Sequence, residues 1–302
     1  MTVTDEHFPS DTSQPALPDC AWAAFTEDGP WVLVEDSLVW ARGLNAVRDR
    51  AKAEVPTLTT PSKVPHIGRM LIVVGRIGWA VGNWWVRKRL GRFKSTEASH
   101  SDLSLRLRRA IEALGATYIK LAQIISSGEG LFPSELVNEF KKCRDQVPAE
   151  DFDVVQRTIE RDLGRPINEV FQSIDSTALA AASIAQVHRA TLLDGTEVVI
   201  KVQRPDVARL VRTDLKVMAW LAPHLVGRIP VAALANPPAL VELFAETIVE
   251  ELDFRLEASS MVDVAKVLHD LGQTRYVLAH IRNWLRPAPS SCSELMDLIS
   301  TM

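Results

Sequence analysis

The stretch ASIAQVHRATLLDGTEVVIKVQRP, residues 182–205, constrains the fold of this 302-residue chain more tightly than any other part. Its Asp194–Gly195 pair lies between two runs rich in β-branched residues. This is a hairpin signal, because Asp-Gly readily takes the positive φ of a tight turn. The second run, GTEVVIKVQ, carries Lys201 near its end. Together with the residues from Ile174 onward, the stretch predicts a three-stranded antiparallel unit.

Apolar residues before and after this unit recur at spacings of three and four, which indicates amphipathic helices. One long helix is predicted over 102–127, where Lys120 and Gln123 are three apart and share a face. Two shorter helices are predicted in PSELVNEFKKCRDQVP and DFDVVQRTIERDLG, and another long helix over 240–271. Helices combined with a small antiparallel sheet give the fold class α+β.

Composition narrows the classes of function. The net charge of −4 gives no overall attraction to nucleic acid, so no nucleic-acid partner is expected. The three cysteines, Cys20, Cys143 and Cys292, are far apart and odd in number, which suggests neither a disulfide framework nor a metal site. The acidic, polar N-terminus MTVTDEHFPSDTSQP is unlike a secretory signal or a transit peptide, so a cytoplasmic location is expected.

Residues 70–86, MLIVVGRIGWAVGNWWV, are nearly all apolar and are followed by a basic run that begins Arg87–Lys88–Arg89. Their length is at the bottom of the range for a membrane-spanning helix, and Arg76 costs about 2.5–3.5 kcal/mol on insertion scales. One alternative is a helix lying on an anionic membrane surface, where each basic residue contributes about 1 kcal/mol. The other is a helix packed on the domain with a solvated basic face.

Four segments, taken in order, resemble the UbiB family of atypical, protein-kinase-like proteins. They are LGATYIKLAQ at 114–123, CRDQVP at 143–148, the strand unit at 182–205 and EELDFRLEA at 250–258. Family members carry LGPxFIKxGQ and a segment close to LRDQVPP at the first two, and an Ala-rich loop where a protein kinase has G-x-G-x-x-G. The resemblance covers about residues 101–265. It implies a kinase-like N-lobe, made of a small antiparallel sheet with an αC-type helix, after a helical extension.

The resemblance also implies a nucleotide site. Lys201 would neutralise nucleotide phosphates, and Glu257 would pair with it. The two carboxylates before Glu257 would contact the helix that carries Lys-x-x-Gln, which packs over the site in the family. The residues implied for the nucleotide are Lys201, Glu257, Ala180, Ala181, Ala182, Ser183, Lys120, Gln123, Glu251 and Asp253.

The chain departs from the related patterns at two places. Alanines stand where a kinase loop has glycines, and alanine resists positive φ. Ala122 replaces the glycine of the family motif, where its Cβ could hinder a close backbone approach. Each motif also has a plainer explanation: a solvated helix face for Lys120 and Gln123, a solvated strand lysine, a small-residue packing turn, and solvated helical carboxylates.

The family's catalytic segments, H-G-D-x-H-P-G-N and a later D-F-G, do not occur in the chain. Phosphoryl transfer needs their Asp and Asn side chains as base and metal ligands. We therefore assign no catalytic residue and no metal ligand. ATP binding is expected to be weak or lost, and Mg²⁺ is expected only for full-length members.

The expected organisation lacks a C-lobe and comprises a variable, partly disordered region 1–65, an amphipathic basic segment 66–100, a helical extension 101–165, an N-lobe 166–270 and a divergent tail 271–302 without a further strand.

The sequence thus predicts a truncated UbiB-family protein of the atypical kinase or ATPase type. The family role is the biosynthesis of ubiquinone or related isoprenoid quinones, so a nucleotide and quinone-biosynthesis proteins are the expected partners. One alternative is a pseudokinase scaffold without enzymatic activity, attached peripherally to the inner face of the plasma membrane. Another is a non-functional gene remnant.

Overall fold

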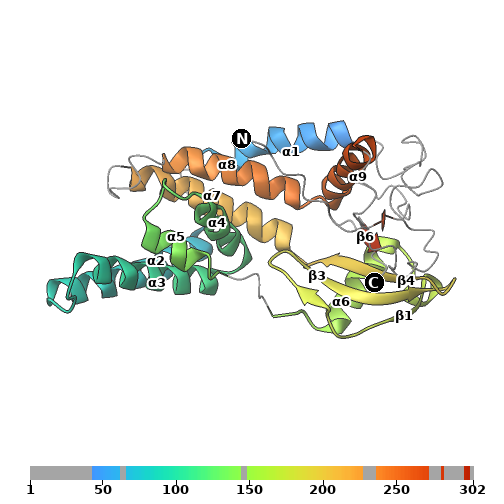
Figure 1. The fold of residues 1–302 in the computed structure, drawn as a ribbon, viewed down its shortest axis with the longest axis horizontal. Helices are drawn as coiled ribbons and strands as arrows, with labels where there is room; N and C mark the ends of the chain where they lie inside the picture. The colour runs from blue at the N-terminus through green and yellow to red at the C-terminus, as the bar shows by residue number, and fades with distance from the viewer. Residues whose placement is uncertain are drawn as a thin grey trace, which may run out of the picture.

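The computed structural model describes residues 43–61, 66–143, 148–226, 236–271, 280–281 and 296–299. In this part of the chain a group of helices lies beside a small antiparallel sheet, which confirms the α+β fold class (Figure 1). The segment 1–20, predicted to be disordered, lies outside the described residues, as do most of CRDQVP and most of the tail.

The α-helices run in chain order as α1 (Leu44–Thr59), α2 (Ile67–Arg89), α3 (Thr96–Leu114), α4 (Ala116–Ser127), α5 (Ser134–Phe140), α6 (Phe152–Leu163), α7 (Val207–Leu225), α8 (Pro237–Glu251) and α9 (Phe254–Asp270). The 3₁₀ helix η4 spans Ile167–Glu169. The strands are β1 (Phe171–Ile174), β2 (Ala180–Ala181), β3 (Ala185–Leu192), β4 (Glu197–Gln203), β5 (His280–Ile281) and β6 (Met296–Ile299).

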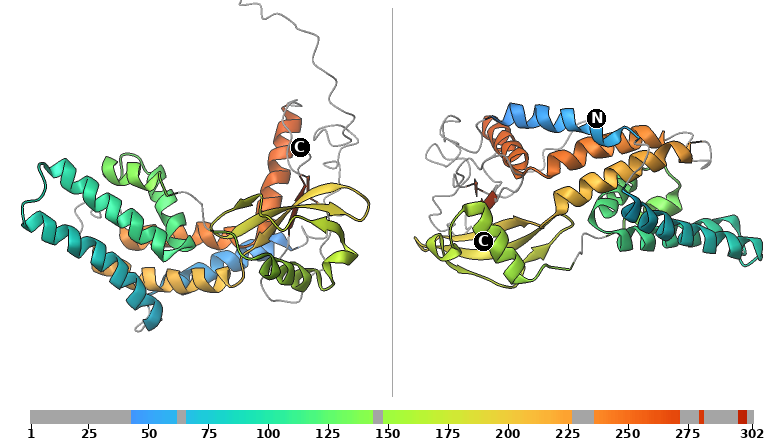
Figure 2. Two further views of the ribbon diagram at one scale, coloured as in Figure 1. Left: turned by 90° about the horizontal axis from the view of Figure 1, so that it is seen from below. Right: turned by 180° about the vertical axis from the view of Figure 1, so that it is seen from behind.

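The helices form the larger part of the fold. Helices α7 and α8 lie side by side, α1 packs along α8, and the α2–α3 pair projects from them as a hairpin (Figures 1 and 2). The largest buried cluster joins α7 and α8 through side chains such as Leu215, Phe244 and Ile248. Arg69 of α2 donates hydrogen bonds to both carboxylate oxygens of Asp214 on α7, at 2.6 and 3.0 Å, and so fixes the hairpin to this cluster.

The sheet has the strand order β1-β3-β4-β6-β5, and β2 pairs with β3 outside this path. The predicted hairpin is confirmed, because β3 and β4 pair antiparallel and Gly195 takes a φ of 83° in the turn between them. Side chains alternate across a strand. Ile200 of β4 is therefore buried in the cluster that the sheet shares with α6, and Lys201 lies on the opposite face.

The prediction that the tail 271–302 lacks a further strand is wrong. Strand β6 pairs antiparallel with the outer edge of β4, where Met296 lies opposite Lys201, and β5 pairs with β6. The sequence MDLI of β6 is short and contains an aspartate, so its own strand propensity is low. Its pairing depends on the edge of β4, whose backbone groups would otherwise be unpaired.

Both long helices predicted from apolar spacing are interrupted. The first breaks at Gly115, which has a φ of 97° and separates α3 from α4, because glycine takes positive φ without a steric penalty. The second breaks after α8, where Asp253 accepts a hydrogen bond from the backbone N–H of Arg255 at 3.0 Å. This side chain satisfies a donor of the first turn of α9 and so favours a new helix start.

Candidate functional site

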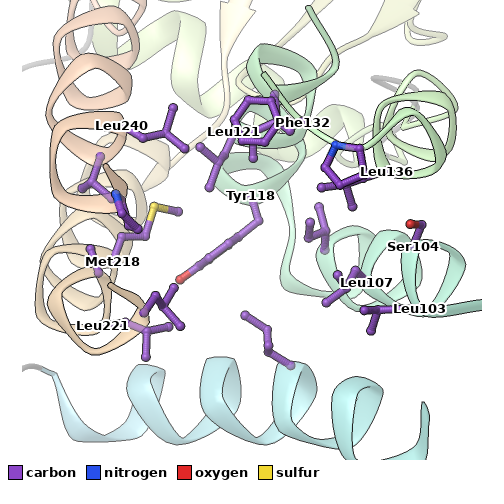
Figure 3. Close-up of a pocket in the computed structure, with 18 of the residues that line it drawn as sticks. Leu103, Ser104, Leu107, Tyr118, Leu121, Phe132, Leu136, Met218, Leu221 and Leu240 are labelled. Atoms are coloured by element: carbon purple, nitrogen blue, oxygen red, sulfur yellow. The ribbon is translucent and has the colours of Figure 1, made fainter. Parts of the chain in front are cut away.

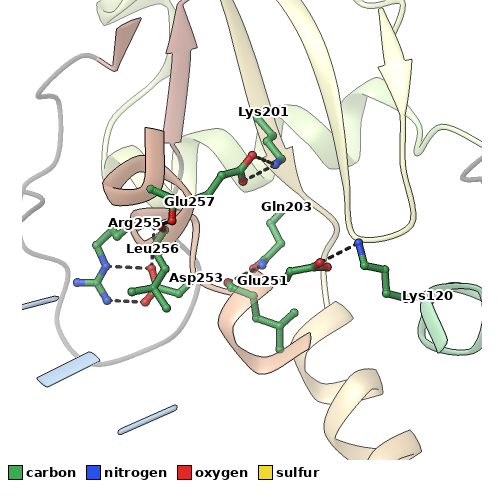
Figure 4. A network of polar contacts seen from close by, with 10 residues as sticks. Lys120, Lys201, Gln203, Glu251, Asp253, Arg255, Leu256 and Glu257 are labelled. Atoms are coloured by element: carbon green, nitrogen blue, oxygen red, sulfur yellow. Dashed lines mark hydrogen bonds and ion pairs between the residues drawn. The ribbon is translucent and has the colours of Figure 1, made fainter. Parts of the chain in front are cut away.

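Lys201 lies near the end of β4 on the face of the sheet that turns toward α9 (Figure 4). The strand register places Ala180 opposite Val187, and Val187 opposite Lys201. Residues paired across an antiparallel sheet point to the same face, and neighbouring strands are about 4.8 Å apart. The Ala-rich turn therefore begins two strands from Lys201, on the same face of the sheet.

Glu257 of α9 holds the Lys201 ammonium. Lys201 Nζ donates to both carboxylate oxygens of Glu257, at 2.8 and 2.5 Å. The same Nζ lies 4.5 Å from the ring centroid of Phe254, one turn earlier on α9. The predicted pairing of Lys201 with Glu257 is confirmed. The Glu257 side chain is 42% exposed, so the pair contributes little to stability and serves mainly to position the lysine.

A second ion pair joins the helical part to the end of α8. Lys120 Nζ of α4 lies 2.8 Å from a carboxylate oxygen of Glu251 (Figure 4). Between the two ion pairs, Gln203 Nε2 of β4 donates to the backbone carbonyl of Leu252 at 2.8 Å. The predicted contact of Glu251 with the Lys-x-x-Gln helix is therefore present.

The predicted contact of Asp253 with that helix is wrong. Both Asp253 carboxylate oxygens accept hydrogen bonds from the Arg255 guanidinium, at 3.1 and 2.8 Å. The prediction assumed one continuous helix, whereas Asp253 lies in the break before α9. The backbone carbonyl of Gln123 accepts hydrogen bonds from the hydroxyls of Ser126 and Ser127, both within α4.

The turn formed by Ala180, Ala181, Ala182 and Ser183 is held in place by Arg204. The backbone N–H of Ala182 donates to the carbonyl of Ala185 at 2.8 Å, and Arg204 Nε donates to the carbonyl of Ala182 at 3.1 Å. Arg204 also bonds Glu150 Oε1 at 2.6 Å. Ser183 is buried in this turn. The sequence interpretation did not include Arg204, although an arginine directly after the strand and before a proline was visible in it.

A buried polar network on the other face of the sheet was also missed. His188 is fully buried; its Nδ1 donates to the carbonyl of Asp175 at 2.8 Å, and its Nε2 accepts from the Gln186 amide at 2.8 Å. The Gln186 side-chain oxygen accepts from the backbone N–H of Glu150 at 2.8 Å. These contacts give Gln186 and His188, the polar residues of AQVH, a structural role, because they connect β3 to the segments around Glu150 and Asp175. Strand alternation places Gln186 and His188 on the same face as the buried Ala190.

Ala122 does not lie where its Cβ could hinder an approach to the site. It is fully buried in a cluster with Ile119, Phe140 and Cys143, between α4 and α5. The predicted hindrance is therefore wrong in this geometry. On a helix, the residue at 122 faces away from the direction of Lys120 by about 200°.

The site residues fit one part of an ATP–Mg²⁺ complex. A partly exposed lysine ammonium on the same sheet face as a small-residue turn fits an anionic phosphate group. Over the part of the chain that the structure describes, no group of three or more His, Cys, Asp or Glu side chains comes together as metal ligands.

Comparison with known proteins identifies the domain. Residues 142–277 match the ABC1 atypical kinase-like domain. The chain is 39% identical over 182 residues to a probable protein kinase UbiB of Photobacterium profundum, covering 59% of this chain and 33% of that protein. It is 38% identical over 196 residues to an uncharacterized aarF domain-containing protein kinase, chloroplastic, of Arabidopsis thaliana, covering 60% and 35%.

One solved structure is also similar, a Mycobacterium tuberculosis protein in complex with erythromycin. It is 29% identical, with a TM-score of 0.37, over 60% of this chain and 43% of that one. The chain thus spans about a third of the length of the two kinase relatives it matches. Residues 142–277 thus carry an ABC1 atypical kinase-like domain, which includes the strand lysine and its glutamate partner, and over this region the chain is similar to UbiB and aarF-domain proteins.

Proposed function

We propose that this chain binds the phosphates of a nucleotide through Lys201 and acts in the biosynthesis of ubiquinone or a related isoprenoid quinone. The observation that carries the proposal is the Lys201–Glu257 ion pair on the sheet face that also holds the start of the Ala-rich turn. Because Glu257 neutralises the lysine before a nucleotide arrives, binding requires the ammonium to be shared between carboxylate and phosphate. The affinity for ATP is therefore low.

The proposal includes the absence of phosphoryl transfer by this chain alone. The sequence holds neither H-G-D-x-H-P-G-N nor D-F-G, whose side chains serve as base and metal ligands in the family. Glu251 is engaged by Lys120, and Asp253 by Arg255, so neither carboxylate is free to replace them without rearrangement. ATP binding is consequently expected to change little when Mg²⁺ is added.

The test is ATP titration and ATP hydrolysis, with and without Mg²⁺, on wild type, Lys201→Ala and Lys142→Ala. Lys142 is a surface lysine paired with Glu139 and provides a control matched in charge. We expect weak ATP binding in wild type and Lys142→Ala, loss of binding in Lys201→Ala, and no turnover in any of them. Equal ATP binding in wild type and Lys201→Ala would contradict the site. Turnover that Lys201→Ala abolishes would contradict the lack of catalysis.

A second candidate function is attachment to an anionic membrane surface, with the chain acting as a scaffold. On α2, Trp79 is 76% exposed, and Leu71, Ile72 and Val86 on the same side of the helix are exposed as well. Trp84 faces the protein instead, where its indole N–H donates to the carbonyl of Ser99 at 2.9 Å. An exposed apolar face that ends in a basic run is typical of helices that lie on membranes.

No described helix is both long and apolar enough to cross a bilayer. We expect the chain to co-sediment with vesicles that contain anionic lipid. Replacing the five basic residues at the end of α2 and directly after it by glutamine should weaken this binding by several orders of magnitude at low salt, at about 1 kcal/mol for each charge. These residues are Arg87, Lys88, Arg89, Arg92 and Lys94.

Two controls separate the contributions to membrane binding. Trp79→Ala removes apolar surface without changing charge, and it should weaken binding to anionic and neutral vesicles alike. Arg161→Gln changes an exposed arginine far from α2 and should have little effect. Equal binding of wild type to neutral vesicles at high salt would contradict the electrostatic contribution. Failure of both Trp79→Ala and the quintuple variant to reduce binding would contradict attachment through α2.

A further inference from the structure

The helical part of the molecule contains a cavity of about 550 Å³ that is separate from the Lys201 face (Figure 3). It lies among α2, α3, α4, α5, α7 and α8, and its wall is almost entirely apolar. Side chains such as Leu103, Leu107, Leu121, Met218 and Leu240 form this wall. The volume is within the range of about 300–1,000 Å³ that is usual for small-molecule sites.

The lining of the cavity extends along α3. Its lining residues on α3 run from His100 to Ile111, which corresponds to about 16 Å at the helical rise per residue. Lys88 and His100 line it near the tip of the α2–α3 hairpin, and Tyr118 and Met218 line it nearer the body of the bundle. A lining of this length accommodates an extended chain of carbon atoms.

Tyr118 supplies the polar group of the inner part. It projects from α4 across the space toward Met218 and Leu221, with the hydroxyl at its tip (Figure 3). The residue is 4% exposed, and its hydroxyl has no hydrogen-bond partner in the part of the chain that the structure describes. Burial is the main cause that raises the pKa of this hydroxyl, so it stays protonated and able to donate. A buried hydroxyl without a partner costs free energy, which an arriving acceptor would recover.

We propose that this cavity binds a neutral, mostly hydrocarbon chain with one oxygen that accepts a hydrogen bond from Tyr118, as in a long-chain ketone or ester. The apolar wall would penalise a charged group at this depth. The site is independent of the proposed nucleotide site, since its lining residues all come from the helices and the 132–133 turn.

The test uses displacement of the fluorescent probe N-phenyl-1-naphthylamine from the full chain. The competitors are 2-undecanone and 2-methyl-1-undecene, in which a methylene group replaces the ketone oxygen. The ketone should displace the probe from wild type at about five- to tenfold lower concentration than the alkene, as expected for one net hydrogen bond. Tyr118→Phe should bind both compounds equally and should melt, without ligand, at the same temperature as wild type or higher.

Two variants fill the cavity and one control does not. Leu107→Trp and Ser104→Leu add side-chain volume inside the cavity, and each should weaken the binding of both competitors at least tenfold. Leu193→Trp adds the same ring on the exposed β3–β4 turn and should leave binding unchanged. Circular dichroism checks that each variant is folded, and the wild-type comparison of the two competitors does not depend on any variant.

Four outcomes would overturn the proposal. Equal displacement of the probe by ketone and alkene in wild type would show that Tyr118 donates no hydrogen bond to the ligand. A lower melting temperature of Tyr118→Phe would show that its hydroxyl already has a partner. Unchanged binding in both folded filling variants would place the probe elsewhere. A dimer that dissociates in Leu107→Trp, measured by analytical ultracentrifugation, would assign the apolar surface to a second copy of the chain.

Discussion

Replacing Asp214 with alanine is expected to lower the free energy of unfolding by about 3–5 kcal/mol, the loss typical of breaking a buried ion pair by removing one partner. Asp214 is fully buried, and the Arg69 side chain that pairs with it is 16% exposed. Arg69 Nη2 also donates to the backbone carbonyl of Leu114 at 2.6 Å, at the end of α3. The variant would leave the arginine buried without its carboxylate and would loosen the contact among α2, α3 and α7. Urea unfolding followed by tryptophan fluorescence measures the loss.

A matched surface variant and a double variant make this prediction specific. Arg209→Ala breaks an exposed ion pair between α7 and Asp206, the residue before this helix, and should cost less than about 1 kcal/mol. Arg69→Met combined with Asp214→Leu replaces both charges by apolar groups, so it should cost less than Asp214→Ala alone. A loss below about 1 kcal/mol for Asp214→Ala would show that the pair is hydrated in solution.

This ion pair could not be predicted from the sequence, because its partners are 145 residues apart and neither belongs to a motif. Features that depend on neighbouring residues were predicted more accurately than this long-range contact. The Asp194–Gly195 turn was predicted correctly because its chemistry is contained in a few neighbouring residues. Apolar spacing predicted the helices but not their breaks, since the periodic pattern continues through Gly115 without marking a change of direction. The pairing of β6 depends on the edge of β4 and has no local signal of its own.

The candidate site was predicted to the extent that motifs and regular geometry allowed. The resemblance supplied the Lys201–Glu257 pair and the contact of Lys120 with the end of α8, and the structure has both. The prediction for Asp253 was wrong because it assumed a continuous helix. Asp253 lies in a helix break, where helical periodicity no longer determines the direction of the side chain. The buried pair Gln186 and His188 was overlooked because polar strand residues are usually solvated.

Phe254→Ala is expected to destabilise the protein by about 3–5 kcal/mol and to release the Lys201–Glu257 pair from its support. Phe254 is 1% exposed, and it is the first residue of α9 after the break. Its ring packs in the largest buried cluster and also lies under the Lys201 ammonium, at 4.5 Å from centroid to Nζ. Truncation would leave a cavity at the point where α9 is attached, so both the burial of the ring and the cation–π contact would be lost. Urea unfolding measures the first effect, and the ATP titration used for Lys201→Ala measures the second.

The position of Phe254 between core and site makes two control variants informative. Leu243→Ala truncates a side chain on α8 that is 55% exposed and should change stability by less than about 0.5 kcal/mol. Phe254→Leu keeps an apolar group in the core but removes the ring beneath the ammonium. It should therefore lose less stability than Phe254→Ala and still weaken the contacts that position Lys201. If Phe254→Leu and wild type bind ATP equally while Phe254→Ala does not, the core packing of α9 positions Glu257, and the ring itself does not. A stability loss for Phe254→Ala no larger than that of Leu243→Ala would contradict the anchoring of α9 through this residue.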